Sequence, residues 1–129
     1  MENENLVVYA LEHRIISLYV KDFRTATFQD ALDSAKIIKE YCIECDWDSP
    51  GIKLIEFGHG SFIEKEAREY SATKEANTYT HGAAILVNNL AQQLIGDYYL
   101  RFNHPKYPTK VFYKKEKAMA WMVEKLKNY

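Results

Sequence analysis

Residues 88–121 read NNLAQQLIGDYYLRFNHPKYPTKVFYKKEKAMAW, and this stretch decides the fold. Its first part predicts an amphipathic helix that ends before Pro105 and Pro108, because proline cannot continue a helix. Thr109–Tyr113 then predicts a short strand, and Lys115–Lys127 predicts a last helix with an apolar face. A helix, a rigid connection, a strand and a helix in this order are typical of an α/β sheet.

The helix at the start of this stretch is expected to begin after a cap at Asn88 or Asn89 and to pack on the sheet. Its inward face is expected to consist of Leu90, Leu94, Ile95, Tyr98 and Phe102. Gly96 lies inside the helix and costs about 1 kcal/mol relative to alanine, which indicates close packing against a neighbour.

The first half of the chain also alternates between strand and helix patterns. Two β-rich runs, Leu6–Ala10 and Ile15–Val20, predict an antiparallel hairpin. Thr27 is expected to cap a helix that runs to about Cys42, with Asp30 in place of the usual Glu of a capping box. The apolar residues of that helix recur at three- and four-residue spacing, so we expect it to lie on the sheet.

The middle of the chain supplies two further strands and one helix. Ile52–Phe57 predicts a strand, and Ser61 with Glu64 three residues later predicts the capped start of the helix after it. His81–Val87 is almost continuously apolar, as is typical of a strand buried on both faces. The order β-β-α-β-α-β-α-β-α predicts a mixed, partly parallel α/β sheet of about five strands covered by about four helices, in a single domain over residues 1–129.

Composition and charge exclude several classes of function. The 129 residues carry 17 basic and 18 acidic side chains, so no net positive charge attracts nucleic acid or an anionic membrane. The longest apolar run, Ala83–Val87, is far shorter than the roughly 20 residues that span a bilayer. Met1–Asn5 is acidic and polar, unlike the start of a secretory signal. We therefore expect a cytoplasmic protein that binds neither nucleic acid nor membrane.

Two cysteines, Cys42 and Cys45, have the C-x-x-C spacing of redox and zinc motifs. They fall at the end of the predicted helix, where the helix dipole disfavours a thiolate. Four histidines are scattered without the spacing of zinc ligands: His13, His59, His81 and His104. The interpretation is that Cys42 packs in the core, and we expect no metal site, no redox pair and no cofactor.

The block GDYYLRFNHPKYPTKVFYKKEKAMAWM, with EAREY at Glu66–Tyr70 and AAILV at Ala83–Val87, resembles the small bacterial STAS-like domains. These domains have the fold of anti-sigma-factor antagonists. The resemblance runs in element order from about Ile15 to Leu126. It implies a STAS-like fold and a non-catalytic regulatory or protein-interaction module rather than an enzyme.

The resemblance also implies a functional turn. In the better-understood STAS members, a kinase phosphorylates a serine at the start of the helix after the third strand, and this controls partner binding. Element order puts the turn Gly58-His59-Gly60-Ser61 there, so Ser61 is the implied phosphorylation position, although Gly60 replaces the aspartate of the family pattern. A helix N-terminus would stabilise the phosphate, whereas Glu64 would repel it, and capping alone also accounts for Ser61.

Aromatic residues are unusually frequent, with ten tyrosines, six phenylalanines and two tryptophans. Not all can face one small core, so we expect a contact surface with Tyr99, Tyr107 and Tyr113 that binds an unknown protein partner or a second copy. A tyrosine-rich edge of the core is the other interpretation. The alternative function is a small-molecule-binding protein or enzyme with a pocket near His59 and His81. No local spacing indicates a catalytic triad, so no catalytic residue is assigned.

Overall fold

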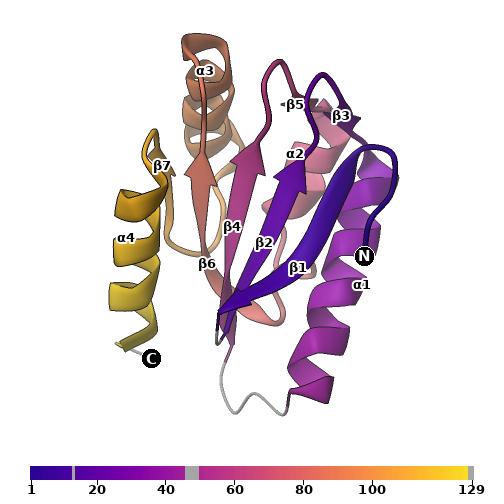
Figure 1. The fold of residues 1–129 in the computed structure, drawn as a ribbon, viewed down its shortest axis with the longest axis vertical. Helices are drawn as coiled ribbons and strands as arrows, with labels where there is room; N and C mark the ends of the chain where they lie inside the picture. The colour runs from indigo at the N-terminus through magenta and orange to yellow at the C-terminus, as the bar shows by residue number, and fades with distance from the viewer. Residues whose placement is uncertain (13, 46–49, 128–129) are drawn as a thin grey trace.

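The main sheet has five strands in the order β1-β2-β4-β6-β7, in a computed structural model that describes residues 1–12, 14–45 and 50–127 (Figure 1). The strands are β1 (Leu6–Glu12), β2 (Ile15–Val20), β4 (Gly51–Phe57), β6 (Thr80–Leu86) and β7 (Thr109–Phe112). β1 and β2 form the predicted antiparallel hairpin, and the other neighbours are parallel. The mixed, partly parallel sheet is therefore confirmed.

Four α-helices cover this sheet. They are α1 (Phe28–Glu44), α2 (Lys65–Ser71), α3 (Leu90–Tyr98) and α4 (Lys115–Lys127). The π-helix η1 (Tyr99–Asn103) continues α3 directly. A second, two-stranded parallel sheet was not predicted, and it pairs β3 (Thr25–Ala26) with β5 (Phe62–Ile63). In the sequence β5 comes between β4 and α2, so α2 begins later than predicted, at Lys65.

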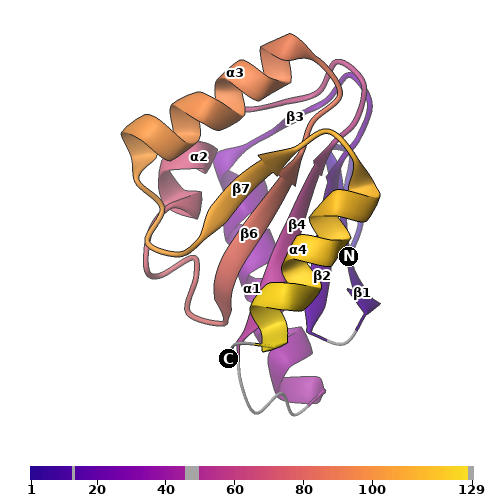
Figure 2. The ribbon, with the colours of Figure 1, turned by 90° about the vertical axis from the view of Figure 1, so that its left-hand side faces the viewer.

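The helices lie on both faces of the main sheet. Successive side chains of a strand point to opposite faces, and β2 shows the result. Ile16 packs in one hydrophobic cluster with Ile38 of α1, whereas Ile15 packs in another with Ala118 of α4. A third cluster joins β6 to η1 on the α1 face. Figure 2 shows α4 crossing in front of β4 and β2, with α2 and α3 to the left of the strands.

Local sequence signals account for the start of α1. The Thr27 hydroxyl accepts from the Asp30 backbone N–H at 3.2 Å, and the Asp30 carboxylate accepts from the Thr27 backbone N–H at 2.8 Å. Asn3 and Asn5 also donate to the Asp30 carboxylate, at 2.8 and 2.9 Å. The predicted capping box is confirmed, and it also ties the N-terminal segment to α1.

Two further predictions are confirmed by burial. All seven residues of β6 are buried, as expected of a strand covered on both faces. Cys42 is a buried free thiol in the α1 cluster, and Cys45 is an exposed one. No helix in the described part of the chain is long and apolar enough to span a bilayer.

Candidate functional site

The turn Gly58–Ser61, called the Gly58 turn below, follows β4 and lies against the connection after β2. The Asp22 carboxylate accepts from the His59 backbone N–H at 2.9 Å, and the Phe23 backbone N–H donates to the His59 carbonyl at 2.7 Å. A Cβ on Gly58 would lie only 2.4 Å from the Asp22 carboxylate. The two connections are therefore packed backbone to backbone at the carboxyl ends of β2 and β4.

The predicted role of Ser61 as a helix cap is wrong. Its hydroxyl is buried and donates to the Gly58 carbonyl at 2.8 Å. α2 begins only at Lys65, with Glu64 at the cap position. The physical reason is β5, because the residues after Ser61 extend to pair with β3 instead of entering the helix.

Glu64 has a different role from the one predicted. Its carboxylate accepts from the Phe28 backbone N–H at 2.6 Å, at the start of α1 rather than α2. A phosphate on Ser61 would therefore not lie at a helix N-terminus. Phosphorylation of Ser61 stays a prediction, and a kinase would reach this hydroxyl only after the turn opens.

A small polar network surrounds Asp22 at the same end of the sheet. The Tyr19 hydroxyl donates to the Asp22 carboxylate at 2.9 Å. This bond, followed by the bond from the His59 backbone, holds the pKa of Asp22 below its usual value. The same contact raises the pKa of Tyr19. The network thus keeps one exposed carboxylate ionised beside His59.

The structure does not bring His59 and His81 together. β4 and β6 are parallel and pair Gly51 with Thr80, so His81 lies near the start of the sheet. His59 follows the opposite, carboxyl end. Burial, and then the charge of Arg14, lowers the pKa of His81. The prediction of one pocket near both histidines is therefore wrong.

The three tyrosines expected on one surface are also separated. Tyr99 is 7% exposed and belongs to the cluster of β6 and η1, and burial raises its pKa. Tyr107 and Tyr113 lie before and after β7, at opposite ends of that strand. The Tyr113 hydroxyl hydrogen-bonds the Gln93 side chain of α3. Tyr99 supports the interpretation of a tyrosine-rich core edge.

A run of exposed apolar side chains lies instead on α3 and η1. Four side chains spaced by four residues form it, here called the α3 stripe: Leu90, Leu94, Tyr98 and Phe102, which are 66, 59, 48 and 57% exposed. These residues were predicted to face inward, and that prediction is wrong for all four. The rings of Tyr98 and Phe102 lie 4.5 Å apart and form a continuous aromatic end of the stripe.

Polar contacts explain why α3 presents its other face to the sheet. The buried Gln92 amide donates to the carbonyls of Gly58 and Ser61 at 2.8 and 3.1 Å. Gly96 lies against Val111, where a Cβ would be 3.0 Å from the Val111 side chain. The close packing predicted from Gly96 is confirmed. Gly96 was the one sequence signal that could have identified the inward face.

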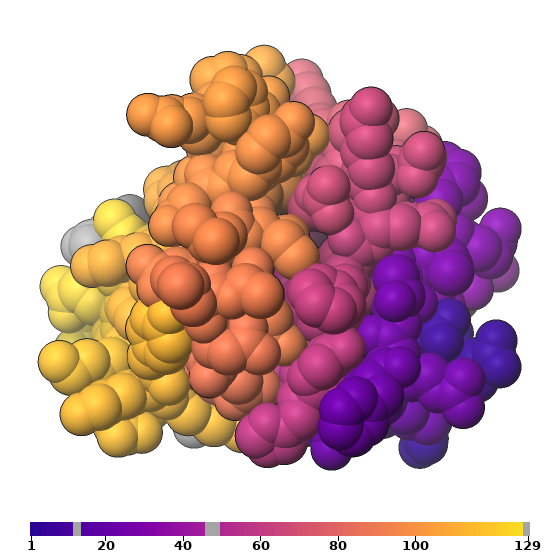
Figure 3. Space-filling model, turned by 90° about the horizontal axis from the view of Figure 1, so that it is seen from above, coloured from indigo at the N-terminus to yellow at the C-terminus, as the bar shows by residue number. Residues whose placement is uncertain are grey.

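A hollow runs beside the stripe, between α3 and α2 (Figure 3). A surface depression of about 250 Å³ is lined there by Arg68, Leu94, Ile95 and Tyr98. Beneath it a cavity of about 30 Å³ reaches Gly96 and Tyr99 and shares Arg68 and Ile95 with the depression. The stripe is therefore flanked by room for a side chain from another molecule.

In residues 1–12, 14–45 and 50–127, no three His, Cys, Asp or Glu side chains lie close enough together to hold a metal ion. His13 lies outside the described residues. The arrangement offers an ionised carboxylate at the Gly58 turn and an apolar helix face.

Comparisons with known proteins add a family and a fold. Residues 9–126 match a family described as "Domain of unknown function (DUF7793)". No protein with a curated description matches the sequence significantly. The structure is similar to that of an uncharacterized protein from the DUF3478 family with a SpoIIAA-like fold, from Shewanella loihica PV-4.

The similarity to that crystal structure extends over nearly the whole of both molecules. It covers 95% of this chain and 98% of the other, with a TM-score of 0.60 and 14% sequence identity. At this identity the similarity shows the fold alone. The STAS-like fold expected from the sequence is thereby confirmed.

Proposed function

The chain belongs to the DUF7793 family, and we propose that it is a non-catalytic protein-interaction module that pairs with a second copy of itself through the α3 stripe. The observation that carries this proposal is the exposure of four large apolar side chains along one side of α3 and η1. Contiguous apolar patches on a folded protein mark sites of contact with other molecules.

Amphipathicity supports the stripe as a contact surface. α3 and η1 have seven exposed residues, and only Asp97 and Arg101 among them are charged. The other five are Leu90, Ala91, Leu94, Tyr98 and Phe102. A solvent-facing helix surface is normally polar, so this one resembles the inner face of a helix pair.

A second copy suits this surface because a two-fold axis places the same patch of each copy against that of the other, with the two α3 helices antiparallel. In a pairing centred on Tyr98, Leu94 of each copy faces the other copy's Phe102. Asp97 and the other copy's Arg101 are then offset by two residues, or about 3 Å along the helix axis. Opposite charges within reach at both ends favour the second copy over an unrelated helix.

The Gly58 turn supports a non-catalytic role. Ser61 lies two residues from His59, but its hydroxyl is buried and already donates to the Gly58 carbonyl. A nucleophile has to be exposed to substrate and bonded to its base, and Ser61 meets neither condition in this conformation.

The experiment is sedimentation velocity and light scattering of the purified protein over a wide concentration range. We expect a monomer–dimer equilibrium, and we expect Leu94→Asp to shift it to monomer because a charge would be buried in the interface. Ile43→Asp is the matched control, since Ile43 is 63% exposed at the far end of α1. Circular dichroism of both variants checks that the fold is retained.

A charge exchange tests the identity of the partner. Asp97→Arg and Arg101→Asp should each weaken the dimer, and the double variant should restore it because the opposite charges meet again. A wild-type monomer at every concentration would refute self-pairing. Dimers that Leu94→Asp leaves unchanged would place the interface elsewhere.

A further inference from the structure

Lys53 lies in the middle of β4 with its amine among apolar side chains. The residue is only 6% exposed, and its neighbours across the sheet are Ile16 and Ala83. Lysine is almost never buried to this degree unless a partner pairs with it. Among residues 1–12, 14–45 and 50–127, none accepts a hydrogen bond from this amine or forms an ion pair with it.

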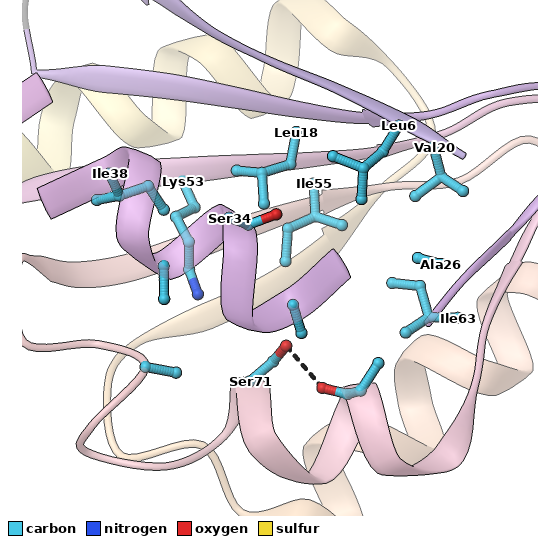
Figure 4. A pocket seen from close by; sticks show the side chains of 14 residues that line it. Leu6, Leu18, Val20, Ala26, Ser34, Ile38, Lys53, Ile55, Ile63 and Ser71 are labelled. Carbon is cyan, nitrogen blue, oxygen red and sulfur yellow. Dashed lines mark hydrogen bonds between the residues drawn. The ribbon is translucent and has the colours of Figure 1, made fainter. Parts of the chain in front are cut away.

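The amine projects into a cavity between β4, α1 and α2, called the Lys53 cavity (Figure 4). The cavity measures about 50 Å³, and aliphatic side chains such as Leu18, Ile38 and Ile55 form most of its walls. Two serine hydroxyls complete the lining. Ser34 and Ser71 each donate to a backbone carbonyl one turn earlier in their own helix, at 2.8 Å. Among the described residues that line the cavity, Lys53 is the only one with an ionisable side chain.

A surface groove leads toward this cavity. It measures about 450 Å³, lies between α1 and the segment after α2, and shares Ala35, Ile38 and Ala76 with the Lys53 cavity. Two lysines of α1, Lys36 and Lys39, line the groove, and its other charged or titratable residues are Tyr70, Glu75 and Tyr79. The groove is thus apolar where it meets the cavity. Elsewhere its lining has more positive than negative side chains.

We propose that the Lys53 cavity binds a small carboxylate with a short apolar chain, whose carboxylate pairs with the Lys53 ammonium. An isolated ammonium in an apolar cavity is unfavourable, and an entering carboxylate supplies the opposite charge that the walls lack. A cavity needs a volume of about 10–15 Å³ to hold one water molecule. The Lys53 cavity is several times larger, so it admits a carboxylate and one or two carbons. The rest of the chain lies in the groove.

The titration of Lys53 supports this site. Burial lowers the pKa of Lys53 to about 8. A carboxylate within ion-pair distance favours the charged amine, so the bound ligand raises that pKa. The amine thereby provides a signal of its own, which does not depend on any activity of the protein or on the α3 stripe.

The test compares hexanoate with 1-hexanol, which have the same chain length and differ in charge. Calorimetry at neutral pH is expected to show binding of hexanoate and much weaker binding of 1-hexanol. Lys53→Met keeps the length and packing of the side chain and should weaken hexanoate binding by roughly tenfold to a hundredfold. Lys117→Met, an exposed position on α4, is the matched control and should bind as the wild type does.

A second measurement uses the unmodified protein. The pKa of the Lys53 amine is followed by NMR of its ε-carbon, with and without hexanoate, and it should rise when hexanoate is bound. Equal binding of hexanoate by the wild type and Lys53→Met would overturn the proposal. An amine titration that hexanoate leaves unchanged would overturn it as well, even if the variant failed to fold.

Discussion

The Gln92 side-chain amide of α3 donates to the Gly58 carbonyl at 2.8 Å, and this bond joins the helix to the turn after β4. The same amide reaches the Ser61 carbonyl, and the Gln92 side-chain oxygen accepts from the Asn88 backbone N–H at 2.8 Å. One fully buried side chain thus holds the start of α3 and the Gly58 turn in a fixed relation.

Replacing Gln92 by alanine should destabilise the protein by about 2–4 kcal/mol, because it leaves buried backbone groups without hydrogen-bond partners. Urea denaturation followed by circular dichroism measures this loss. Gln29→Ala is the control, since Gln29 is exposed on α1 and bonds only Asp33 at the surface. A loss as small as that of the control would show that the Gln92 bonds contribute little.

Replacing Asp30 by alanine should lower the free energy of unfolding by about 1–2 kcal/mol at neutral pH, through the loss of the capping box. Burial raises the pKa of Asp30, but hydrogen bonds from Thr27, Asn5 and Asn3 outweigh it, so the pKa lies below 3.8. The stabilisation from a lowered carboxyl pKa is present above pH 3.8 and is lost as pH falls through the folded value.

Other carboxylates titrate in the same pH range, so the pH dependence is tested on the difference in unfolding free energy between the wild type and Asp30→Ala. Urea denaturation from pH 6 down to pH 2 should show the wild type and Asp30→Ala converging in stability as the pH falls. A gap that stays constant over this range would mean that the ionised carboxylate is not what stabilises α1.

Replacing Gly58 by alanine should cost about 1–3 kcal/mol, because the new Cβ would overlap fixed backbone atoms. The Val20 carbonyl oxygen would lie 2.6 Å from that Cβ and the Asp22 nitrogen 2.8 Å. Thermal unfolding measures the effect. Gly82→Ala is the comparison, since its Cβ would lie 3.0 Å from the nearest atom, the Pro108 carbonyl oxygen, and should cost less. Equal losses would contradict the steric account.

Replacing Lys53 by methionine should raise the free energy of unfolding by about 1–3 kcal/mol at neutral pH, since it removes a buried charge. The lysine pKa is 10.5 in the unfolded chain and about 8 in the folded one. Between these values the unfolded state binds more protons, so the stability of the wild type rises with pH there.

Guanidinium denaturation at pH 7, 8, 9 and 10 checks the pH dependence. We expect the stability of Lys53→Met to rise less with pH than that of the wild type, while Lys117→Met follows the wild type. Tyrosine ionisation is common to all three proteins and cancels in the differences. Parallel curves for the wild type and Lys53→Met would show that the buried amine keeps its ordinary pKa.

Local patterns predicted most of the fold because they depend on neighbours in sequence. The Thr27 capping box, the β1–β2 hairpin and the buried β6 each follow from residues that are close together in the sequence. Gly96 likewise indicated close packing, and its contact with Val111 bears this out.

The candidate sites could not be predicted in the same way, because they depend on contacts between distant segments. Ser61 and Glu64 have the spacing of a capping box, but the two-residue pairing of β5 with β3 has no recognisable pattern and moves the start of α2. The orientation of α3 depends on Gln92, whose polar side chain is buried by bonds to a turn more than thirty residues away. In the sequence, Lys53 has the pattern of an ordinary exposed polar residue of a strand, and only the three-dimensional structure shows that it lines a cavity.

The inward face of α3 carries Gln92 and Gly96, so few apolar contacts attach this helix to the sheet. Segments with few apolar contacts undergo local unfolding at a smaller free-energy cost than the core, and their amide protons exchange sooner. Covering the α3 stripe with a second copy would add the apolar burial that the helix lacks. Association and the local order of α3 would then be thermodynamically coupled, and dimer formation would slow amide exchange along this one helix.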